Sequence, residues 1–407
     1  MRILIITHYF PPEIGAPQAR LSDLARLWTE AGHDVHVITG MPNHPTGIVP
    51  PEYRRRLRIR ESVNGYSTTR TWLYATPNEG FIRKTIGHLS FMVSSVILGF
   101  RDAGRPDVVV VSSPTFFSIG SAWVVARLKR ARFVVEVRDL WPAIFVELGV
   151  LTNRWIIAVL EKLELAAYRS ADAVVTVSEG FTANIIDRGI DAAKVHTVTN
   201  GVDVDAFDPN APSDSSVRAE LGATQGDCLV LYIGAHGISQ GVSTIVEAAT
   251  KVCDNRVRIA LVGEGADREH VLDTIERLAP PNVVALPGVS RDRVAALLAA
   301  ADVCLVPLRD IPLFTTFIPS KIFELLAAGR PIIGSVAGEP ADILRRAGAT
   351  VVSPENADEL AAAIDDLAGD VTRRAEIGAR GRSFVEANYN RRALATKYLS
   401  VLEGVVR

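Results

Sequence analysis

Short apolar runs alternate with helix-period segments along almost the whole chain, and this alternation is the feature that most constrains the fold. The runs are continuously apolar, which is typical of parallel strands covered on both faces. Strand–helix alternation of this length predicts doubly wound α/β structure. The expected strands are Ile3–Thr7, Val35–Thr39, Val108–Ser112, Phe133–Val137, Ala173–Val177, Val195–Thr199, Cys228–Ile233, Val257–Val262, Val283–Leu286, Val303–Pro307, Pro331–Gly334 and Thr350–Val352. The expected helices include Gln18–Ala31, Trp155–Arg169, Gly241–Val252, Arg291–Ala300 and Ser320–Ala328.

The alternation breaks at Asn200–Ser216, a segment rich in Asp, Asn, Pro and Ser that has no hydrophobic period. Such a composition predicts an interdomain linker, and 407 residues suit two domains better than a single core. We expect Rossmann-like domains over residues 1–203 and 204–385, followed by a C-terminal segment over 386–407. Ligands of such sheets bind at the carboxyl ends of the strands, so two facing domains can share one pair of substrates.

Composition excludes several functional classes. A formal net charge of −2 provides no overall field that would attract nucleic acid. The three cysteines, Cys228, Cys253 and Cys304, are far apart and form no Cys-x-x-Cys motif, which argues against a disulfide framework or a zinc site. We therefore expect a reducing, cytoplasmic location. The first residues, MRILIITHYFPP, predict a buried strand and not a signal peptide.

Two neighbouring segments raise the question of a membrane. Phe81–Phe100 is largely apolar but contains Arg83, Lys84 and His88, which leaves about a dozen apolar positions, too few for a span. A buried helix and an amphipathic helix that touches a membrane are the favoured alternatives. The run Tyr53–Arg60 holds five arginines in eight residues. Such a run is usually solvated or meets phosphates nonspecifically, and here it would also suit peripheral contact with an anionic membrane.

The segment Thr316–Pro331 carries the strongest functional pattern. Pro319 stands where a helix begins, and Gly329 and Pro331 mark its end. The free amides and partial positive charge of a helix N-terminus suit a diphosphate, to which Ser320 and Lys321 would contribute. Glu324 lies one turn later on the same face, where a carboxylate can accept hydrogen bonds from a ribose. The alternative is an ordinary amphipathic helix with solvated Lys and Glu side chains.

Three further segments follow expected strands in the second half: Tyr232–Gly241, Leu261–Gly265 and Leu286–Ser290. The first contains three glycines that permit close backbone approach, which suits a phosphate cradle. The third offers backbone groups that could pair with a nucleobase. A lone loop histidine is more often structural than functional. The expected donor-binding residues of these segments are His236, Gln240, Gly263, Gly265 and Val289.

Two segments of the first half also leave expected strands. Thr7–Pro17 forms a loop in which Gly15 permits close approach to a ligand. In Glu136–Pro142, Arg138 and Asp139 place opposite charges side by side, and Trp141 offers a flat face for a sugar ring. The alternative for this motif is a surface ion pair beside a buried tryptophan.

In this order the segments resemble glycosyltransferase family 4, enzymes of the GT-B fold, and more closely its L-fucosamine-transferase-like branch of bacterial surface-polysaccharide enzymes. The resemblance covers essentially the whole chain. Its matching stretches are HYFPPEIGAP, GMPNHPTG (Gly40–Gly47), EVRDLWP, TNGVD (Thr199–Asp203), YIGAHGISQG, LVGEG and PSKIFELLAAGRP. It implies two Rossmann-like domains facing a central cleft, with the acceptor in the first and the donor in the second. The final helix, Arg391–Val406, would cross back onto the first domain.

The resemblance implies a hexosyl- or N-acetylhexosaminyl-type transferase. Its donor would be a nucleoside-diphosphate sugar, expected to be UDP-linked and N-acetylated or deoxy. Its acceptor would be a polyprenyl-diphosphate-linked saccharide in lipopolysaccharide or capsule synthesis. The family mostly retains anomeric configuration. No metal or other cofactor is expected, because no Asp-x-Asp metal motif is apparent and backbone amides with Lys321 would stabilise the leaving diphosphate.

Residue roles follow from the same resemblance. The expected catalytic residues are Asp139 as a candidate base, Lys321 on the diphosphate and Glu324 on the ribose. Gly15, Thr316, Pro319 and Ser320 join the donor-binding set, and Arg138 and Trp141 lie on the acceptor side.

Three positions depart from the family pattern: its first motif Glu is Thr316 here, and its glycine-loop Arg and Lys are Ala235 and Gln240. The branch that the chain most resembles shares these changes, which shift charge neutralisation onto Lys321. They also motivate a competing hypothesis, a catalytically degenerate partner subunit of another transferase. A sugar-nucleotide 2-epimerase, which has the same two-domain fold, is the other alternative.

Overall fold

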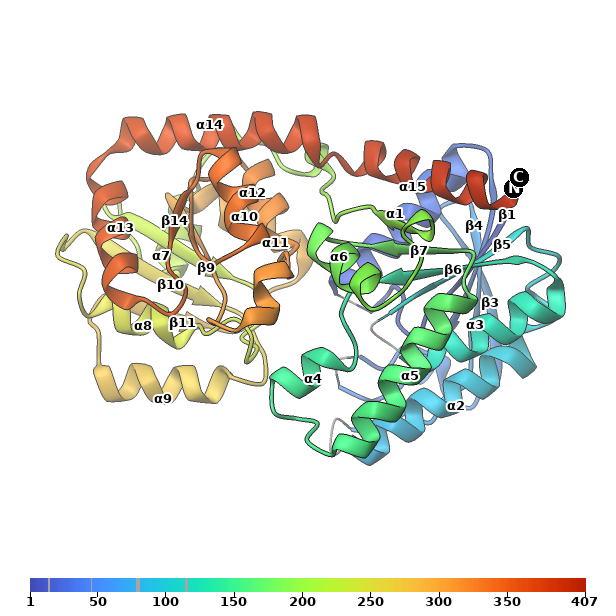
Figure 1. Ribbon diagram of the computed structural model, residues 1–407. Helices are drawn as coiled ribbons and strands as arrows, with labels where there is room; N and C mark the ends of the chain where they lie inside the picture. The colour runs from blue at the N-terminus through green and yellow to red at the C-terminus, as the bar shows by residue number, and fades with distance from the viewer. Residues whose placement is uncertain (14, 45, 78–80, 114–115) are drawn as a thin grey trace. The chain divides into compact units, whose positions relative to one another are not determined.

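The computed structural model describes residues 1–13, 15–44, 46–77, 81–113 and 116–407, with only the backbone described for Ala16, Phe81 and Ile82. Ile14 of the HYFPPEIGAP stretch and Pro45 of GMPNHPTG lie outside the described residues. The chain divides into two compact units, and Figure 1 shows helices on both faces of the sheet in each. Unit 1 comprises Met1–Thr199 and Arg392–Arg407, and unit 2 comprises Asn200–Arg391.

Unit 1 contains an eight-stranded sheet in the order β3-β4-β2-β1-β5-β6-β7-β8. Every pairing is parallel except that of β3 with β4. The strands are β1 Arg2–Ile6, β2 Asp34–Gly40, β3 Arg58–Val63, β4 Tyr66–Thr71, β5 Val108–Ser112, β6 Arg132–Val137, β7 Ala173–Thr176 and β8 Val195–Thr197. The helices are α1 Ala16–Glu30, α2 Phe81–Gly99, α3 Phe116–Lys129, α4 Ala143–Glu147, α5 Arg154–Ser170, α6 Glu179–Asp187 and α15 Arg391–Val406.

Unit 2 contains a six-stranded parallel sheet in the order β11-β10-β9-β12-β13-β14. The order reverses between β9 and β12, as in a Rossmann sheet, and ligands bind at that switch point. The strands are β9 Cys228–Ile233, β10 Val257–Val262, β11 Val283–Leu286, β12 Val303–Pro307, β13 Ile332–Ser335 and β14 Thr350–Val352. The helices are α7 Ser215–Glu220, α8 Ser243–Ala249, α9 Arg268–Leu278, α10 Arg291–Ala300, α11 Lys321–Ala327, α12 Glu339–Ala347, α13 Ala357–Gly369 and α14 Val371–Asn388.

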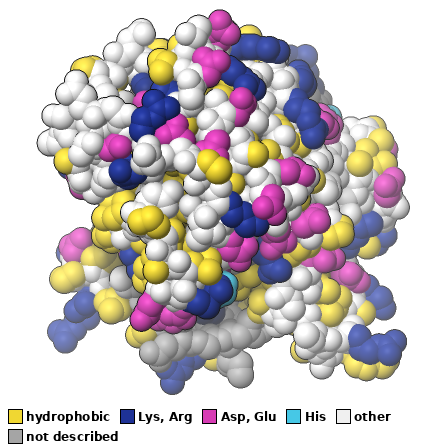
Figure 2. Space-filling model, turned by 90° about the vertical axis from the view of Figure 1, so that its left-hand side faces the viewer, with side chains coloured by type: hydrophobic (Ala, Val, Ile, Leu, Met, Phe, Trp, Pro, Cys, Tyr) yellow, Lys and Arg dark blue, Asp and Glu magenta, His cyan; other side chains and the backbone are white. Residues whose placement is uncertain are grey.

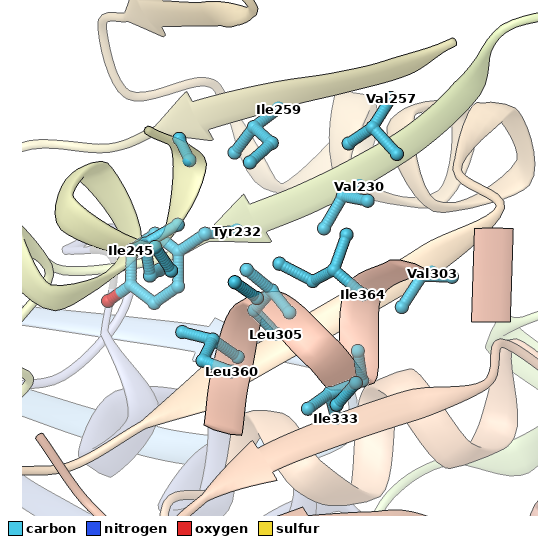
Figure 3. Packing of buried hydrophobic residues seen from close by; sticks show 14 of the residues in the cluster. Val230, Tyr232, Ile245, Val257, Ile259, Val303, Leu305, Ile333, Leu360 and Ile364 are labelled. Atoms are coloured by element: carbon cyan, nitrogen blue, oxygen red, sulfur yellow. The ribbon is translucent and has the colours of Figure 1, made fainter. Parts of the chain in front are cut away.

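Each unit has its own hydrophobic core. In unit 2, alternate residues of β9, β10 and β12 pack against α8 and α13; Figure 3 labels Val230, Ile259 and Leu305 from the strands with Ile245 and Ile364 from the helices. In unit 1, the corresponding face of the sheet packs against α1 and α15. All twelve expected strands are present, so the predicted doubly wound α/β class is confirmed.

The sequence analysis missed the β3–β4 hairpin, which forms the outer edge of the unit 1 sheet. Its two-residue turn, Asn64–Gly65, has positive φ at both positions, 52° and 85°. Asn-Gly is the favoured pair for such a turn, so the sequence did carry the local pattern. The strands, RIRESV and YSTTRT, consist mostly of polar residues, so a search for apolar runs does not find them.

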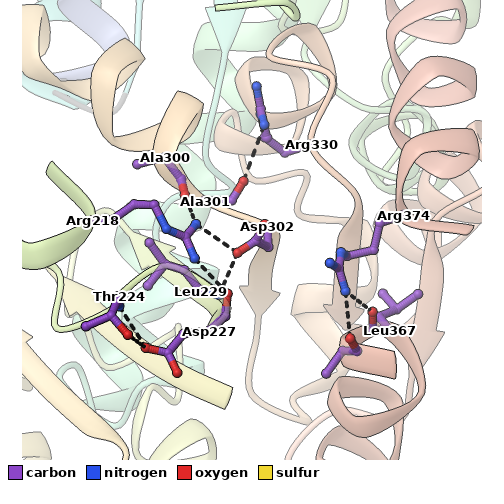
Figure 4. A network of polar contacts seen from close by, with 11 residues as sticks. Arg218, Thr224, Asp227, Leu229, Ala300, Ala301, Asp302, Arg330, Leu367 and Arg374 are labelled. Carbon is purple, nitrogen blue, oxygen red and sulfur yellow. Dashed lines mark hydrogen bonds and ion pairs between the residues drawn. The ribbon is translucent and has the colours of Figure 1, made fainter. Parts of the chain in front are cut away.

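The predicted linker segment is fixed to unit 2. Arg382 donates to the carbonyls of Val204 and Phe207, and Arg330 donates to the carbonyl of Pro209. Figure 4 shows Arg330 beside a network in which the Arg218 guanidinium donates to Asp302 and to backbone carbonyls. Arg218 and Arg330 thus donate to backbone carbonyls at the amino edge of the sheet, and their guanidinium groups stabilise the fold there.

The apolar segment Phe81–Phe100 folds as helix α2, with Phe91 buried and Ile97 exposed. Within the described residues, no helix is both long and apolar enough to cross a membrane. The neighbouring arginine run divides in two: Arg58 and Arg60 pair with Asp102, whereas Arg54, Arg55 and Arg56 precede β3 and are exposed. Cationic and anionic side chains intermingle on the face drawn in Figure 2, as the small net charge predicts.

Candidate functional site

Four of the sequence-predicted segments meet at the carboxyl edge of the unit 2 sheet. The segments begin where β9, β10 and β11 end, and the loop after β12 leads into α11. Parallel register places the ends of β9, β10 and β11 side by side, with Val262 opposite both Ile233 and Leu286. This edge contains the β9–β12 switch point, where an open α/β sheet binds its ligand.

Two glycine-containing loops interlock at this edge. A Cβ atom on Gly263 would lie 1.8 Å from the carbonyl oxygen of Gly234, and one on Gly265 would lie 2.2 Å from that of His236. The amide of His236 donates to the carbonyl of Glu264 at 2.9 Å. Gly263 and Gly265 are therefore required for loop-to-loop packing, a role that the sequence analysis did not assign to them.

The Lys321 ammonium is buried against the first loop. Its Nζ lies 3.9 Å from the centroid of the Tyr232 ring and has no hydrogen-bond partner among the described residues. A Cβ atom on Gly234 would come within 2.6 Å of that Nζ, so the glycine makes room for the ammonium. Burial lowers the pKa of Lys321 to about 7, although the neighbouring Glu324 carboxylate opposes the shift.

Glu324 lies one turn further along α11 and is half-buried. Burial raises the pKa of its carboxyl, while the positive charges of Arg291, Arg391 and Lys321 act in the opposite direction. The sequence prediction that Lys321 and Glu324 share one helix face is consistent with this coupling. A carboxylate near these cations can accept hydrogen bonds from hydroxyl groups of a ligand.

The start of α11 differs in detail from the expectation. The helix spans only Lys321–Ala327, and the amides of Ile322 and Phe323 already donate to the carbonyls of Pro319 and Ser320. The amides of Ser320 and Lys321, by contrast, have no backbone acceptor among the described residues. Thr316 closes the preceding 3-10 turn η4, Pro312–Thr316, by donating its hydroxyl to the carbonyl of Leu313 at 2.8 Å.

Two polar side chains of the Tyr232–Gly241 loop have different environments. Gln240 accepts from the amide of Gly237 at 3.1 Å and so holds the loop in shape. His236 is buried, and neither ring nitrogen has a hydrogen-bond partner among the described residues. Burial, together with the charges of Arg268 and Lys321, lowers the pKa of His236 to about 4, so the ring is neutral at pH 7. A neutral imidazole provides one donor and one acceptor for a ligand.

The Leu286–Ser290 loop lies beside the second glycine loop. A Cβ atom on Gly288 would lie 3.3 Å from Cγ of Glu264, and Val289 is half-buried. The loop therefore borders the second glycine loop, and its contact with a nucleobase stays a prediction. The sequence analysis overlooked two cations at the same edge: Arg268, whose Nε donates to the carbonyl of Gly263, and Arg291, the first residue of α10. Arg291 directly follows the selected segment Leu286–Ser290, and Arg268 lies three residues after the selected segment Leu261–Gly265.

In unit 1, the two selected motifs lie at the carboxyl ends of β1 and β6. Gly15 caps the N-terminus of α1 with an extended backbone (φ 168°), and a Cβ atom there would lie 2.3 Å from Oε1 of Gln18. This φ is open to any residue, and the near atom is the end of a flexible side chain, so neither observation by itself requires glycine at this position. Arg138 is buried, and its amide donates to the hydroxyl of Ser113. Burial raises the pKa of Asp139, against the lowering effect of the Arg138 charge.

Trp141 is half-exposed, and it stacks on Phe116 with ring centroids 4.5 Å apart. This arrangement lies between the two alternatives for the motif, a sugar platform and a buried tryptophan. The motif's first residue has an anchoring role that the sequence analysis missed. Glu136 is fully buried and accepts from Arg20 at 2.8 Å. Burial raises its pKa, but Arg20 and Arg138 outweigh burial and hold the pKa below its usual value.

A second missed anchor joins two stretches of the resemblance. Glu13 is buried, and its carboxylate accepts from the amides of Asn43 and His44, each at 2.8 Å. The loops after β1 and β2 are thereby fixed to one another. Contrary to the expectation from the sequence, an Asp-x-Asp sequence does occur at Asp203–Asp205, and it begins at the last residue of the TNGVD stretch. There the Asp203 carboxylate accepts from the amide of Asp205 and caps the 3-10 turn Val204–Ala206.

Comparison with known proteins places both units in glycosyltransferase families. Residues 15–201 match a family model described as a glycosyl transferase 4-like domain, and residues 227–370 match one described as glycosyl transferases group 1. The putative colanic acid biosynthesis glycosyl transferase WcaI of Escherichia coli is 25% identical over 334 residues, which is 81% of this chain and 82% of WcaI.

Solved structures share the fold over nearly the full length. Sucrose-phosphate synthase from Thermosynechococcus elongatus has a TM-score of 0.77 at 19% identity, covering 99% of this chain and 98% of that chain. HepE from Anabaena, solved in complex with UDP-glucose, has a TM-score of 0.74 at 17% identity, covering 99% and 100% of the two chains. These likenesses confirm the GT-B fold that the sequence predicted.

Proposed function

Because this chain belongs to the GT-B glycosyltransferases that join a glycosyl transferase 4-like domain to a group 1 domain, we propose that it transfers a sugar from UDP to a lipid-linked saccharide. Two likenesses support the finer part of the proposal. HepE was solved with UDP-glucose, and the name of WcaI connects that relative with a surface polysaccharide. A polyprenyl diphosphate is the proposed carrier of the acceptor.

The observation that carries the proposal is the environment of Lys321. Its buried ammonium lacks a hydrogen-bond partner among the described residues and lies beside a glycine, at the edge of the sheet that binds ligands. Burying a cation without a partner lowers the stability of the fold. A buried, unpartnered lysine at this edge therefore indicates a ligand that supplies the missing anion. A diphosphate fits, because it would also meet the free amides of Ser320 and Lys321.

The proposed mechanism follows from where charge develops. As the anomeric bond breaks, negative charge grows on the diphosphate, and Lys321 with the two amides stabilises it without a metal ion. Glu324 holds the ribose, His236 donates to the ligand, and the Leu286–Ser290 loop lies near the base. Retention of anomeric configuration is proposed, with the leaving phosphate assisting attack from the same face. Asp139 is the proposed proton acceptor, because a raised pKa makes a carboxylate a better base.

Substitution of Lys321 tests the proposal. At saturating UDP-sugar, Lys321→Met is expected to lower turnover by about 10²–10³-fold, the effect of removing one such donor. UDP affinity should fall less, because the charge on the diphosphate is largest in the transition state. Glu324→Ala should show the converse, weaker UDP binding by calorimetry in a folded protein.

Three outcomes would contradict this scheme. Near-parental turnover of Lys321→Met would indicate that Arg268 or Arg291, and not Lys321, neutralises the charge on the diphosphate. Conversion of labelled UDP-sugar in the absence of any acceptor would identify an epimerase, and a chain that binds UDP but never transfers the sugar would be a partner subunit. Circular dichroism of each variant controls for the fold.

A further inference from the structure

The exposed part of the arginine run lines a pocket in unit 1. The pocket has a volume of about 260 Å³, and its polar and aromatic lining consists of Arg54, Arg55, Arg56, Tyr53, Trp72 and Tyr74. This volume is just below the ~300–1,000 Å³ typical of pockets that enclose a whole small molecule. The pocket therefore suits one end of a larger ligand.

Two of the arginines are available to a ligand. Arg54 donates its Nε to the carbonyl of Val49, whereas no partner is found among the described residues for the guanidinium of Arg55 or Arg56. Arg55 also has φ +60°, an uncommon conformation for a residue with a side chain, which tends to persist at functional sites. The nearest exposed carboxylate in the sequence is Glu52, so the pocket wall carries a net positive charge.

The pocket occupies the ligand-binding edge of its sheet. β2 and β4 are parallel to β1, so Met41 and Trp72, which follow β2 and β4, lie at the same edge as the loop after β1. β3 is antiparallel to β4, which brings its first residue, Arg58, opposite Thr71 and places the preceding arginines at this edge as well. From the sequence, this run was expected to be solvated, to meet phosphates nonspecifically or to contact a membrane, because the hairpin that folds it back was not predicted.

An apolar helix face begins where the pocket ends. The amide of Tyr74 donates to the hydroxyl of Ser90 on α2 at 2.7 Å, and the carbonyl of Tyr74 would lie 2.9 Å from a Cβ atom on Gly87. From this contact onward, α2 exposes a stripe of large apolar side chains, Ile86, Leu89, Val93 and Ile97. The cations and aromatic rings of the pocket thus adjoin the helix that carries an exposed apolar stripe.

We propose that the pocket of Arg54, Arg55, Arg56, Trp72 and Tyr74 binds the phosphate end of the lipid-linked acceptor, with its hydrocarbon chain along the exposed stripe of α2. This rests on the proposed function and adds the position of the acceptor's carrier. Guanidinium groups bind phosphate oxygens through paired hydrogen bonds. Exposed Trp and Tyr rings suit the boundary between a polar head and an apolar chain.

Calorimetry with farnesyl diphosphate tests the pocket. Saturating UDP in every titration occupies the proposed donor site, so that the remaining heat reports a second site. The variant is R55Q/R56Q, and the matched control is R101Q/R105Q, which removes two exposed charges between α2 and β5, at the opposite edge of the sheet. The Kd of R55Q/R56Q should rise about tenfold or more, as expected for the loss of charged hydrogen bonds, and that of the control should be unchanged.

Further arms separate a lipid phosphate from other ligands. Inorganic diphosphate and farnesol should each bind more weakly than farnesyl diphosphate. Equal binding of inorganic diphosphate would overturn the assignment to a lipid-linked group, and so would equal affinities of R55Q/R56Q and the parent. Binding of UDP without binding of farnesyl diphosphate would overturn this pocket alone. Failure to bind UDP would count against the proposed function.

Discussion

The surroundings of Lys321 determine whether its side chain is charged at neutral pH. Burial brings the pKa of Lys321 to about 7, so in the ligand-free protein near neutral pH its charged and neutral forms are both populated. Below this pKa the ammonium form predominates and can pair with a phosphate. A diphosphate bound beside it would favour the ammonium and raise the pKa again. Ligand binding and protonation of Lys321 are therefore linked.

Proton uptake measures this linkage. At pH 8 UDP is already fully ionised, since the terminal phosphate has a pKa of about 6, whereas Lys321 is mostly neutral. UDP binding should therefore take up a fraction of a proton at pH 8. At pH 6 Lys321 is already mostly charged and part of the free UDP is protonated, so binding should release protons instead of taking them up. Titrations in buffers of different ionisation enthalpy give this number. Uptake should vanish in Lys321→Met, and persistence in that variant would identify His236 as the source instead.

The same shift has a defined sign for stability. Between pH 7 and the ordinary value of 10.5, the unfolded chain holds the Lys321 proton and the folded, ligand-free chain does not. The contribution of Lys321 to the free energy of unfolding therefore rises with pH across that window. Saturating UDP should flatten the rise, because the complex keeps the proton.

At the scale of elements, the site depends on loops that touch through glycines. Residues 234–241 and 263–265 leave adjacent parallel strands, and their backbones approach too closely for a side chain at Gly263 or Gly265. Gly234 differs from them, because a Cβ atom there would meet the Lys321 ammonium and not backbone. The first residue of α11, Lys321, therefore packs directly against the glycine loop at Gly234.

Gly234→Ala is expected to lower turnover by about 10–10²-fold, because the new methyl displaces the ammonium from the position that stabilises the diphosphate. Gly226→Ala is the matched control: it also has positive φ, +97° against +141°, but nothing within 4 Å of the added Cβ. Both variants carry backbone strain of about 1–3 kcal/mol. Steady-state assays that show equal losses for the two would attribute the effect to strain and contradict the contact.

At the scale of the whole molecule, the chain crosses between the units twice. After leaving unit 2 at Arg391, it completes the core of unit 1 with α15. There the Trp28 indole donates to the carbonyl of Ala395 at 3.1 Å, and its ring meets that of Tyr398 edge to face. The first and last segments of unit 2 also pair, since Val202 donates to Tyr389 and accepts from Arg391.

Tyr398 tests the contribution of this helix. Its side chain is fully buried, but its hydroxyl has no hydrogen-bond partner among the described residues. Tyr398→Phe should therefore leave the free energy of unfolding unchanged or raise it, whereas Tyr398→Ala should cost about 3–5 kcal/mol. Tyr168→Phe is the control, because it removes a hydroxyl that donates to Glu164 at 2.9 Å and should cost about 1 kcal/mol. Denaturant unfolding of the full chain measures all three, and equal losses in both Phe variants would contradict the assignment.

Local patterns in the sequence were sufficient for most of the secondary structure and for selecting the segments at the site. Continuous apolar runs predict buried parallel strands because both faces of such strands must be covered, and this requirement is visible residue by residue. The glycine loops, Lys321 and Glu324 were selected for similar reasons. The β3–β4 hairpin was missed because its strands are polar, although its Asn-Gly turn was present in the sequence.

The tertiary structure decided which of these segments meet and what their side chains experience. The order of strands places the loops after β9, β10 and β11 side by side, and strand order depends on contacts far apart in the sequence. Only that arrangement shows that Gly263 and Gly265 let two backbones approach closely and that Gly234 accommodates Lys321. In unit 1, only the pairing of β3 with β4 shows that Arg55 lines a pocket. The pKa of Lys321 likewise depends on desolvation by residues from β9 and its loop, which no local pattern contains.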